Sequence, residues 1–268
     1  ILEKNVQIEH FLCYNIKLLT YTQNFKSKKQ QGEIKILLSV TRRELKYTID
    51  YETSLILQNE LECLLQPDTY SQSANGYYTV RSLYFDSWNN KDYKEKFAGI
   101  ERRKKIRLRI YNTNQQNAKL EIKKKEGVYQ KKDSLVISRT EAEQFIQGEY
   151  YRLLDMGEET AYRLYCDMVL GVYRPAAIIE YERRAYVYPA FDTRITFDRN
   201  VKSCETFFNI YSNDITFVPV FTDKVILEVK FNGVLLESIK RVLAKYNLSN
   251  VSVGKYALGR PLMARYIL

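Results

Sequence analysis

The residues best suited to chemistry are basic side chains at alternate positions of one short segment. Arg103, Lys105, Arg107 and Arg109 are separated by single residues that are mostly apolar. This alternation is typical of a β-strand with one charged face and one buried face. Arginine matches phosphate oxygens in a bidentate geometry, and lysine adds a point charge. The charged face of this strand is therefore suited to hold a chain of phosphates.

Four further segments repeat the pattern of an apolar face and a mostly charged face. Their charged faces carry Glu44 and Lys46; Lys119, Glu121 and Lys123; Arg194; and Glu228 and Lys230. One such strand usually turns its charges to solvent, but five in one domain favour another arrangement. If helices cover the apolar faces from outside, the charged faces line a closed barrel wide enough for a ligand. Because enclosed like charges repel each other and lose hydration, we expect a polyanion inside.

Three glutamates interrupt the basic faces: Glu44, Glu121 and Glu228. Carboxylates beside phosphates commonly hold Mg²⁺ or Mn²⁺, whose preferred ligands are oxygens. The sequence thus predicts Mn²⁺ or Mg²⁺ as a cofactor. The alternative is that these glutamates only neutralise neighbouring lysines.

The net charge of +10 is concentrated in one stretch of the chain. Residues 91–133 contain 15 basic and 6 acidic side chains, which accounts for nearly all of the excess. Such a field attracts nucleic acid, an acidic membrane or free phosphates. The charge alone does not choose among these partners.

The residues that several other kinds of catalysis require are missing from this sequence. The only histidine is His10, so a Ser-His-Asp or Cys-His mechanism is nearly excluded. Gly254-Lys255 lacks the spacing and the hydroxyl residue of a Walker A loop, and no G-x-G-x-x-G occurs. The four cysteines are far apart, which argues against a zinc site and suits a reducing, cytoplasmic compartment.

The elements that position these residues are expected to be strands with helices between them. We predict strands at 42–51, 77–86, 106–111, 119–124, 176–187, 193–198 and 225–231, and helices at 52–65, 140–154, 158–170 and 233–246. Residues 1–40 read as a leader and linker, and 41–268 as one domain. No apolar run is long enough to span a membrane. The expected fold is α+β: a closed antiparallel barrel of about eight strands with helices packed outside.

A set of short motifs resembles the vacuolar transporter chaperone (VTC) domain, the polyphosphate polymerase branch of the triphosphate tunnel metalloenzymes. The motifs are RELKY (43–47), VRSLYFD (80–86), RKKIRLR (103–109), LEIKKK (120–125), YERRAY (181–186), TRITFD (193–198), LEVKF (227–231) and GKYALG (254–259). Each is weak alone, but their order is that of the family. Together they cover roughly residues 41–262.

The resemblance implies roles for individual residues. It implies catalytic roles for Lys46, Arg107, Arg109, Lys123 and Lys255, with Lys255 on a last strand. It implies phosphate contacts for Lys131 (or Lys132), Arg183 and Arg194; the charged face shared with Glu228 adds Lys230 as a further phosphate-binding candidate. Glu228 matches the metal-binding glutamate of the family, with Glu121 or Glu44 as a helper.

Three positions depart from the family pattern or leave it ambiguous. Ser252 replaces a second lysine of the eukaryotic polymerase, which would weaken the grip on one phosphate. Arg183 falls on the less polar face of its strand unless a β-bulge intervenes. Arg42-x-Glu44-x-Lys46 lacks the first glutamate of the signature found in the cyclase and thiamine triphosphatase branch.

The function implied by this resemblance is transfer of the γ-phosphoryl group of ATP, or another nucleoside triphosphate, to a growing polyphosphate chain. Such transfer depends on positioning and charge stabilisation more than on a covalent nucleophile. Three alternatives remain: a tunnel hydrolase of triphosphates, a non-catalytic sensor of polyphosphate or inositol phosphates, and a nucleic-acid binder. We expect no nucleic-acid partner, and any membrane link would need a separate protein.

Overall fold

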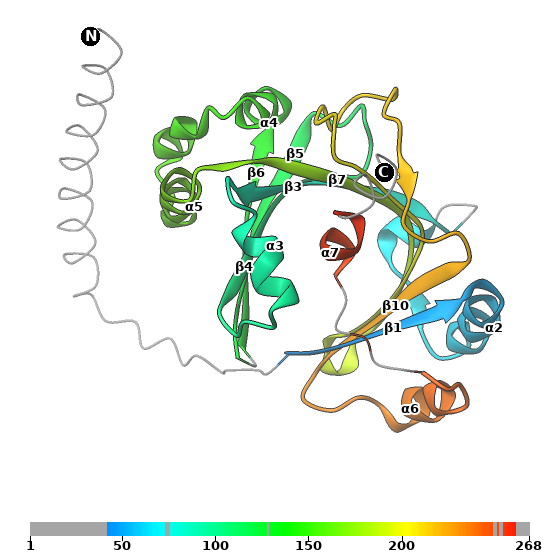
Figure 1. Ribbon diagram of the computed structural model, residues 1–268. Coiled ribbons are helices and arrows are strands. Elements are labelled where there is room, and N and C mark those ends of the chain that lie inside the picture. Colours follow the sequence, from blue (N-terminus) through cyan, green and yellow to red (C-terminus); the bar gives the residue numbers. More distant parts are fainter. Residues whose placement is uncertain (1–41, 73–75, 128, 249–250, 252–253, 261–268) are drawn as a thin grey trace, which may run out of the picture. The chain divides into compact units, whose positions relative to one another are not determined.

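The computed structural model describes residues 42–72, 76–127, 129–248, 251 and 254–260. The predicted leader, residues 1–40, lies outside this range. The described chain folds around one large antiparallel sheet with helices on its convex side and two short helices near its concave side (Figure 1). The α+β class predicted from the sequence is confirmed.

The strands are β1 (Arg42–Asp50), β2 (Gln66–Pro67), β3 (Tyr78–Ser87), β4 (Arg103–Ile110), β5 (Asn117–Glu126), β6 (Tyr129–Ser138), β7 (Tyr173–Tyr188), β8 (Thr193–Cys204), β9 (Val218–Pro219) and β10 (Lys224–Asn232). The α-helices are α2 (Tyr51–Glu62), α3 (Lys91–Phe97), α4 (Arg139–Ile146), α5 (Glu159–Leu170), α6 (Glu237–Ala244) and α7 (Lys255–Gly259). Three short 3₁₀ helices are η1 (Thr69–Gln72), η2 (Tyr150–Met156) and η3 (Ala190–Asp192).

The sheet is curled but not closed, so the prediction of a closed barrel is wrong. The order of its eight long strands is β1-β10-β8-β7-β3-β4-β5-β6, which leaves β1 and β6 as edges. The edge of β1 is bonded elsewhere, because the backbone oxygen of Lys46 accepts a hydrogen bond from the Val251 N–H at 2.8 Å. The ammonium of Lys123 on β5 lies 2.8 Å from the Glu44 carboxylate on β1. Side chains therefore connect the two ends of the sheet where backbone pairing is missing.

Two apolar cores fix which face of each strand looks outward. Leu108 on β4 and Leu120 on β5 are fully buried with Phe145 of α4, in the core under α4, η2 and α5. Leu227 on β10 packs with Leu61 of α2 in the core under α2 and α6. With the apolar faces buried outside, the alternating charged faces turn into the curl.

The two short helices on the concave side are exceptions to the prediction that helices pack outside. Helix α7 lies inside the curl of the sheet (Figure 1), where Tyr256 packs among Tyr84, Ile179 and Ile226. This inner apolar cluster fills part of the interior. Lys255 therefore lies on a helix, and the expectation that it belongs to a last strand is wrong.

Other element boundaries also differ from the sequence prediction. Strand β6 was not predicted, because most of its residues are exposed and only Leu135 and Ile137 are buried and apolar. The helix predicted at 140–154 is split into α4 and η2 at Gly148, whose φ is +93°. Its cap is Ser138, paired in a capping box with Glu141. The helix predicted at 233–246 is shorter, and α3 was not predicted at all.

Candidate functional site

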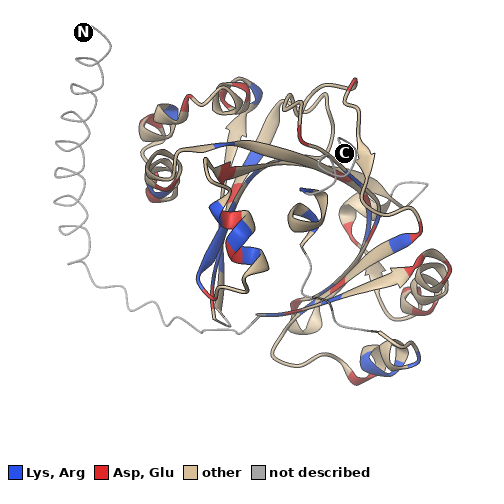
Figure 2. Ribbon diagram, in the orientation of Figure 1, with Lys and Arg blue, Asp and Glu red and all other residues tan. Residues whose placement is uncertain are grey.

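The concave side of the sheet encloses a cavity of about 400 Å³. Two glutamates, Glu44 and Glu228, are its only acidic lining residues among those the structure describes. The basic lining residues are Lys46, Lys96, Arg103, Lys104, Lys105, Arg107, Arg109, Lys123, Lys125, Arg183, Lys230 and Lys255. Figure 2 shows this concentration of basic residues on α3 and β4. The cavity is strongly basic and suited to an anion with several charges.

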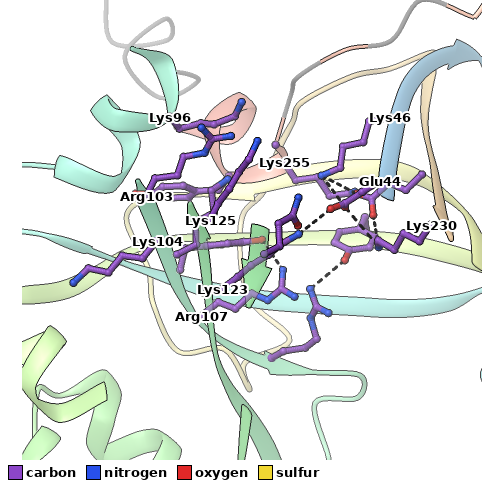
Figure 3. Close-up of a pocket in the computed structure, with 18 of the residues that line it drawn as sticks. Glu44, Lys46, Lys96, Arg103, Lys104, Arg107, Lys123, Lys125, Lys230 and Lys255 are labelled. Atoms are coloured by element: carbon purple, nitrogen blue, oxygen red, sulfur yellow. Dashed lines mark hydrogen bonds and ion pairs between the residues drawn. The ribbon is translucent and has the colours of Figure 1, made fainter. Parts of the chain in front are cut away.

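Glu44 and Glu228 lie close together because both contact the same two lysines. Lys46 Nζ lies 3.1 Å from a Glu44 oxygen and 3.6 Å from a Glu228 oxygen. Lys230 Nζ lies 2.7 Å from Glu228 and 3.8 Å from Glu44 (Figure 3). The strand register explains these contacts, because Glu44 pairs with Lys230 and Lys46 pairs with Glu228 across β1 and β10.

The electrostatics of this group keep both carboxylates ionised. Burial opposes ionisation, yet the ammonium groups of Lys46 and Lys230 lower the pKa of Glu44 to about 2. Burial likewise opposes ionisation of Glu228, but Lys230 and Lys255 hold its pKa well below the usual range. Burial is the larger effect on Lys230, and it lowers the pKa of that ammonium to about 8 despite Glu228.

A buried network extends from Glu228 to β7 and β8. Lys255 Nζ lies 3.1 Å from Glu228 and 2.5 Å from Asp198, which is fully buried. Arg183 donates two hydrogen bonds to the Asp198 carboxylate, at 2.6 and 2.7 Å. Asp198 thus holds Lys255 and Arg183 side by side in the cavity lining.

Arg107 and Arg109 form the opposite wall with Tyr84. Arg107 Nε donates to Glu121 at 2.6 Å, and its Nη1 donates to the Tyr84 hydroxyl at 3.2 Å. Arg109 Nε donates to the Ser82 hydroxyl at 3.1 Å. Burial would raise the pKa of the Tyr84 hydroxyl, but Arg107 and Arg109 lower it to about 8. Tyr84, Arg107 and Arg109 all line the cavity.

The position of Lys255 depends on a buried carboxylate at the end of β3. One Asp86 oxygen accepts the backbone N–H of Asp92 at 2.9 Å, and the other accepts the N–H of Tyr93 at 3.0 Å. The Tyr256 hydroxyl donates to Asp86 at 2.5 Å. Asp86 therefore ties α3 and α7 to the sheet.

Glycine is required where α7 meets the sheet. A Cβ at Gly259 would lie 2.5 Å from Ile179 Cδ1 and 2.9 Å from Ser203 Cβ, closer than atoms can approach. The Ser203 hydroxyl also donates to the Gly259 carbonyl at 2.9 Å. This close approach sets the depth at which the helix places Lys255.

Glu44 and Glu228 fit a metal that shares its ligands with phosphate. Mg²⁺ is commonly bound by one or two carboxylates together with substrate phosphates. Both glutamates are ionised and adjacent, which meets that requirement. No group of three or more His, Cys, Asp or Glu side chains is assembled in the described part of the chain. Glu121 does not join the pair, because it is held by Arg107, Arg109 and Lys132.

Most of the sequence-predicted site residues come together at this cavity. Those that line it are Glu44, Lys46, Arg107, Arg109, Lys123, Arg183, Glu228, Lys230 and Lys255. Arg183 reaches it because the register shifts between Glu180 and Glu182, as a β-bulge requires. Ser252 lies outside the described residues.

Three predicted residues lie elsewhere. Lys131 is on edge strand β6 with a largely exposed side chain that pairs with Asp133 at 3.5 Å. Arg194 donates to Asp68 at 2.6 Å and is not among the lining residues. Glu121 lies behind Arg107 and is almost completely buried.

Some lining residues were missed as site candidates. Lys96 lies on α3, which the sequence pattern did not indicate, and Lys125 comes at the end of β5 beyond the predicted strand. Tyr84 lies within the VRSLYFD motif, and that motif was the available signal. These residues extend the basic lining beyond the set that the family resemblance implies.

A comparison with protein families shows to which family the chain belongs. A family model described as the VTC domain matches residues 41–264. The chain belongs to the VTC domain family. The match spans every described strand and helix, so the basic cavity of this VTC domain lies entirely within the matched region.

A solved structure of another protein shares this fold. A protein from Hippeastrum, described as a proposed adenylyl cyclase with a dominant triphosphatase activity, aligns with a TM-score of 0.51 and 12% identity. The alignment covers 81% of this chain and 94% of that one. A proposed adenylate cyclase from Bacillus halodurans aligns with a TM-score of 0.49 and 12% identity, over 80% and 93% of the two chains. At such identity the likeness concerns the fold alone.

Two further observations are negative. No curated protein matches this VTC domain chain. Among the helices of the described residues, none has the length and apolar character needed to cross a bilayer.

Proposed function

We propose that this VTC domain is a metal-dependent polyphosphate polymerase that transfers the γ-phosphoryl group of ATP to a growing phosphate chain. The observation that carries the proposal is a cavity with twelve basic lining residues and two adjacent ionised glutamates. Many cations in one enclosed space suit a ligand with many phosphates. The two glutamates suit a divalent metal that accompanies a nucleoside triphosphate.

The composition of the lining supports phosphoryl transfer by positioning. No Ser, Thr, Cys or His is among the described residues that line the cavity. The described part of the lining thus offers no covalent nucleophile of the usual kind, and transfer between two bound phosphates needs none. Preorganised cations stabilise the charge that spreads over the transferred group.

Within this proposal the walls of the cavity have separate roles. Arg107, Arg109, Lys123 and Arg183 would bind the phosphates of donor and acceptor. Lys46, Lys230 and Lys255, which contact Glu228, would lie beside the transferred group. Mn²⁺ or Mg²⁺ held by Glu228 and Glu44 would neutralise charge on the phosphate oxygens. Arg194 and Lys131 would contact the chain only beyond the cavity.

The test is incubation of the protein with ATP and Mn²⁺, followed by a gel stained for polyphosphate. Long chains and stoichiometric ADP are expected. Arg109→Ala and Glu228→Gln should both abolish synthesis, and Arg102→Gln, on the exposed turn before β4, is the matched control. Turnover at the wild-type rate in both cavity variants would refute the assigned roles.

The same assay distinguishes the alternatives. Release of orthophosphate without chains would show a triphosphate hydrolase, the activity named for the Hippeastrum protein. Tight polyphosphate binding without turnover, whatever the metal, would show a sensor. Displacement of polyphosphate by RNA would show a nucleic-acid binder.

A further inference from the structure

Four exposed apolar side chains lie where β3 ends and β7 begins. They are Trp88, Val169, Leu170 and Val172, and we call them the apolar patch. Leu170 is 82% exposed, the highest value for a large apolar side chain among the described residues, and Trp88 is 65% exposed. None of the four is among the described residues that line the cavity. A group of apolar side chains open to water marks a surface that associates with a protein or a membrane.

Two turns that are distant in the sequence bring the patch together. Ser87 pairs with Tyr173 in the antiparallel register of β3 and β7, and Trp88 and Val172 are the next residues beyond that pair. Opposed residues of such strands are about 5 Å apart. The Arg174 guanidinium also donates a hydrogen bond to the Trp88 carbonyl at 3.1 Å. The turn before α3 and the turn after α5 therefore form one surface.

The turn after α5 presents Val172 to solvent in an unfavourable backbone conformation. The φ of Val172 is +48°, a region that β-branched residues rarely adopt. Glycine would adopt it without strain. The valine side chain is nevertheless 61% exposed, so it gains little from burial in return. Stability of the fold alone does not account for an apolar side chain at this position.

The backbone beneath the patch is held in place by polar contacts. The Tyr173 hydroxyl donates to Asp92 at 2.8 Å, and its carbonyl accepts a hydrogen bond from the Tyr150 hydroxyl at 2.9 Å. On the other turn, the Ser87 hydroxyl accepts the backbone N–H of Lys91 at 2.9 Å. Both turns are thus tied to the sheet and to α3, and the patch is a preformed surface.

Three exposed basic side chains flank the patch. They are Lys91 and Lys94 on α3 and Arg174 on β7, and we call them the rim cations. Lys91 lies 3.7 Å from Glu95. Within the described part of the chain, neither Lys94 nor Arg174 forms an ion pair with a carboxylate. The surroundings of the patch therefore carry a net positive charge.

This combination suits a membrane surface. Tryptophan favours the level of the lipid head groups, because its ring is apolar and its N–H is polar. Basic side chains beside it are attracted to anionic lipids. A second copy of the chain suits the patch less well, since a symmetric dimer would bring two sets of rim cations together.

We propose that the apolar patch and the rim cations dock this VTC domain on an anionic phospholipid surface, with Trp88, Leu170 and Val172 inserted among the head groups. The domain would then contact a membrane by itself, in addition to any separate partner protein. Docking of this kind is independent of the polymerase activity proposed for the cavity.

The test uses a probe that the sequence provides. Trp88 is the only tryptophan of the chain, so its fluorescence reports on the patch alone. The protein is mixed with vesicles of phosphatidylcholine, either pure or containing phosphatidylglycerol, and binding is measured by co-sedimentation. With the anionic vesicles the emission of Trp88 should shift to the blue, and lipids with brominated acyl chains should quench it. Pure phosphatidylcholine should produce much weaker binding.

Two variants remove parts of the patch and leave Trp88 in place. Leu170→Ser/Val172→Gly should bind anionic vesicles about tenfold or more weakly, because two inserted side chains are lost. Its melting temperature should change little, since both side chains are exposed. Lys94→Gln should weaken binding about fivefold, as expected for one basic residue near an anionic surface.

The matched control is Ile56→Ser/Val234→Gly, which removes two exposed apolar side chains elsewhere on the surface. It should bind anionic vesicles like the wild type. An equal loss of binding in this control would overturn the docking surface.

Three other results would also contradict the proposal. The first is the absence of binding to anionic vesicles. The second is binding with unchanged Trp88 emission, which would assign it to another basic surface. The third is a blue shift that grows with protein concentration and needs no vesicles, which would show that a second copy covers the patch.

Discussion

The two faces of β4 and β5 carry out different tasks within the same eight to ten residues. On the outer face Ile106, Leu108 and Leu120 are fully buried under helices. On the inner face Arg107 and Lys123 line the cavity and form ion pairs with glutamates. The outer face stabilises the fold by removing apolar surface from water. The inner face holds charges whose desolvation costs free energy and which would serve a ligand in the proposed function. Stability and binding are thus separated by the direction of the side chain.

The largest effect is expected from the inner face. Arg107→Ala should lower the initial rate of ATP consumption by about 10²–10³-fold, because a preorganised donor to the transferred phosphates is lost. The melting temperature should change little, since Glu121 keeps Arg109 and Lys132 as partners. Calorimetric melting measured beside the rate checks both parts. A variant that unfolds would contradict the separation of the two faces.

Leu108→Ala tests the outer face at the adjacent position. Leu108 is fully buried, so the cavity left behind should cost about 2–5 kcal/mol of unfolding free energy in urea titrations. The dissociation constant for tripolyphosphate, measured well below the melting temperature, should stay within about twofold of the wild-type value. A large loss of affinity in a folded Leu108→Ala protein would show that the two faces are coupled.

A smaller effect concerns pH. Burial lowers the pKa of Lys105 and of Lys230 to about 8. Phosphate binds the charged ammonium, so affinity is greatest below this value and falls as the pH rises through it. Between pH 7 and pH 9 metal-free tripolyphosphate should bind about tenfold more weakly, since one pKa unit corresponds to about 1.4 kcal/mol. Lys105→Arg should flatten the profile, because a guanidinium stays charged. An unchanged profile in this variant would assign the effect to other groups.

The smallest effect is expected where α3 meets the sheet. Burial raises the pKa of Asp92 to about 7, although the Tyr173 hydroxyl donates to it at 2.8 Å. Because the folded pKa lies above the unfolded value, this group stabilises the fold at low pH, and that contribution is lost as the pH rises through 7. The stability of Asp92→Asn relative to the wild type should therefore rise by at least about 1 kcal/mol between pH 5 and pH 8.5. Urea unfolding at both pH values measures it. A difference independent of pH would show that Asp92 does not titrate in this range.

The sequence predicted the direction of the cavity side chains better than their final positions. Alternation with a period of two determines which face of a strand a residue occupies. Because Ile106 and Leu108 are buried on the outer face, Arg107 between them must point to the inner face. Closure of the barrel was wrongly expected, because alternation carries no information on which strands pair at the edges. Lys131 illustrates the limit: it lies on an edge strand where both faces are largely exposed, so parity does not place it in the cavity.

The helices near the cavity were harder to predict than its strands. Helix α7 has five residues and α3 has seven, which is too short for a 3.6-residue period to be visible. Lys255 was still predicted as a site residue, through the family motif and not through periodicity. Lys96 had no comparable motif and was missed. The contribution of this short helix to the cavity lining could be recognised only in three dimensions.

The place of Lys255 in the chain bears on how the protein is made. A ribosome synthesises Asp198 and Glu228 well before Lys255, yet in the folded protein Lys255 contacts both. A nascent chain that curls its sheet early would enclose these carboxylates with one cation fewer, and a buried charge without its partner costs several kcal/mol. Electrostatic balance in the interior is reached only when α7 inserts. The proposed competence to bind phosphate should therefore appear only once α7 has left the ribosome, after every described strand of the sheet.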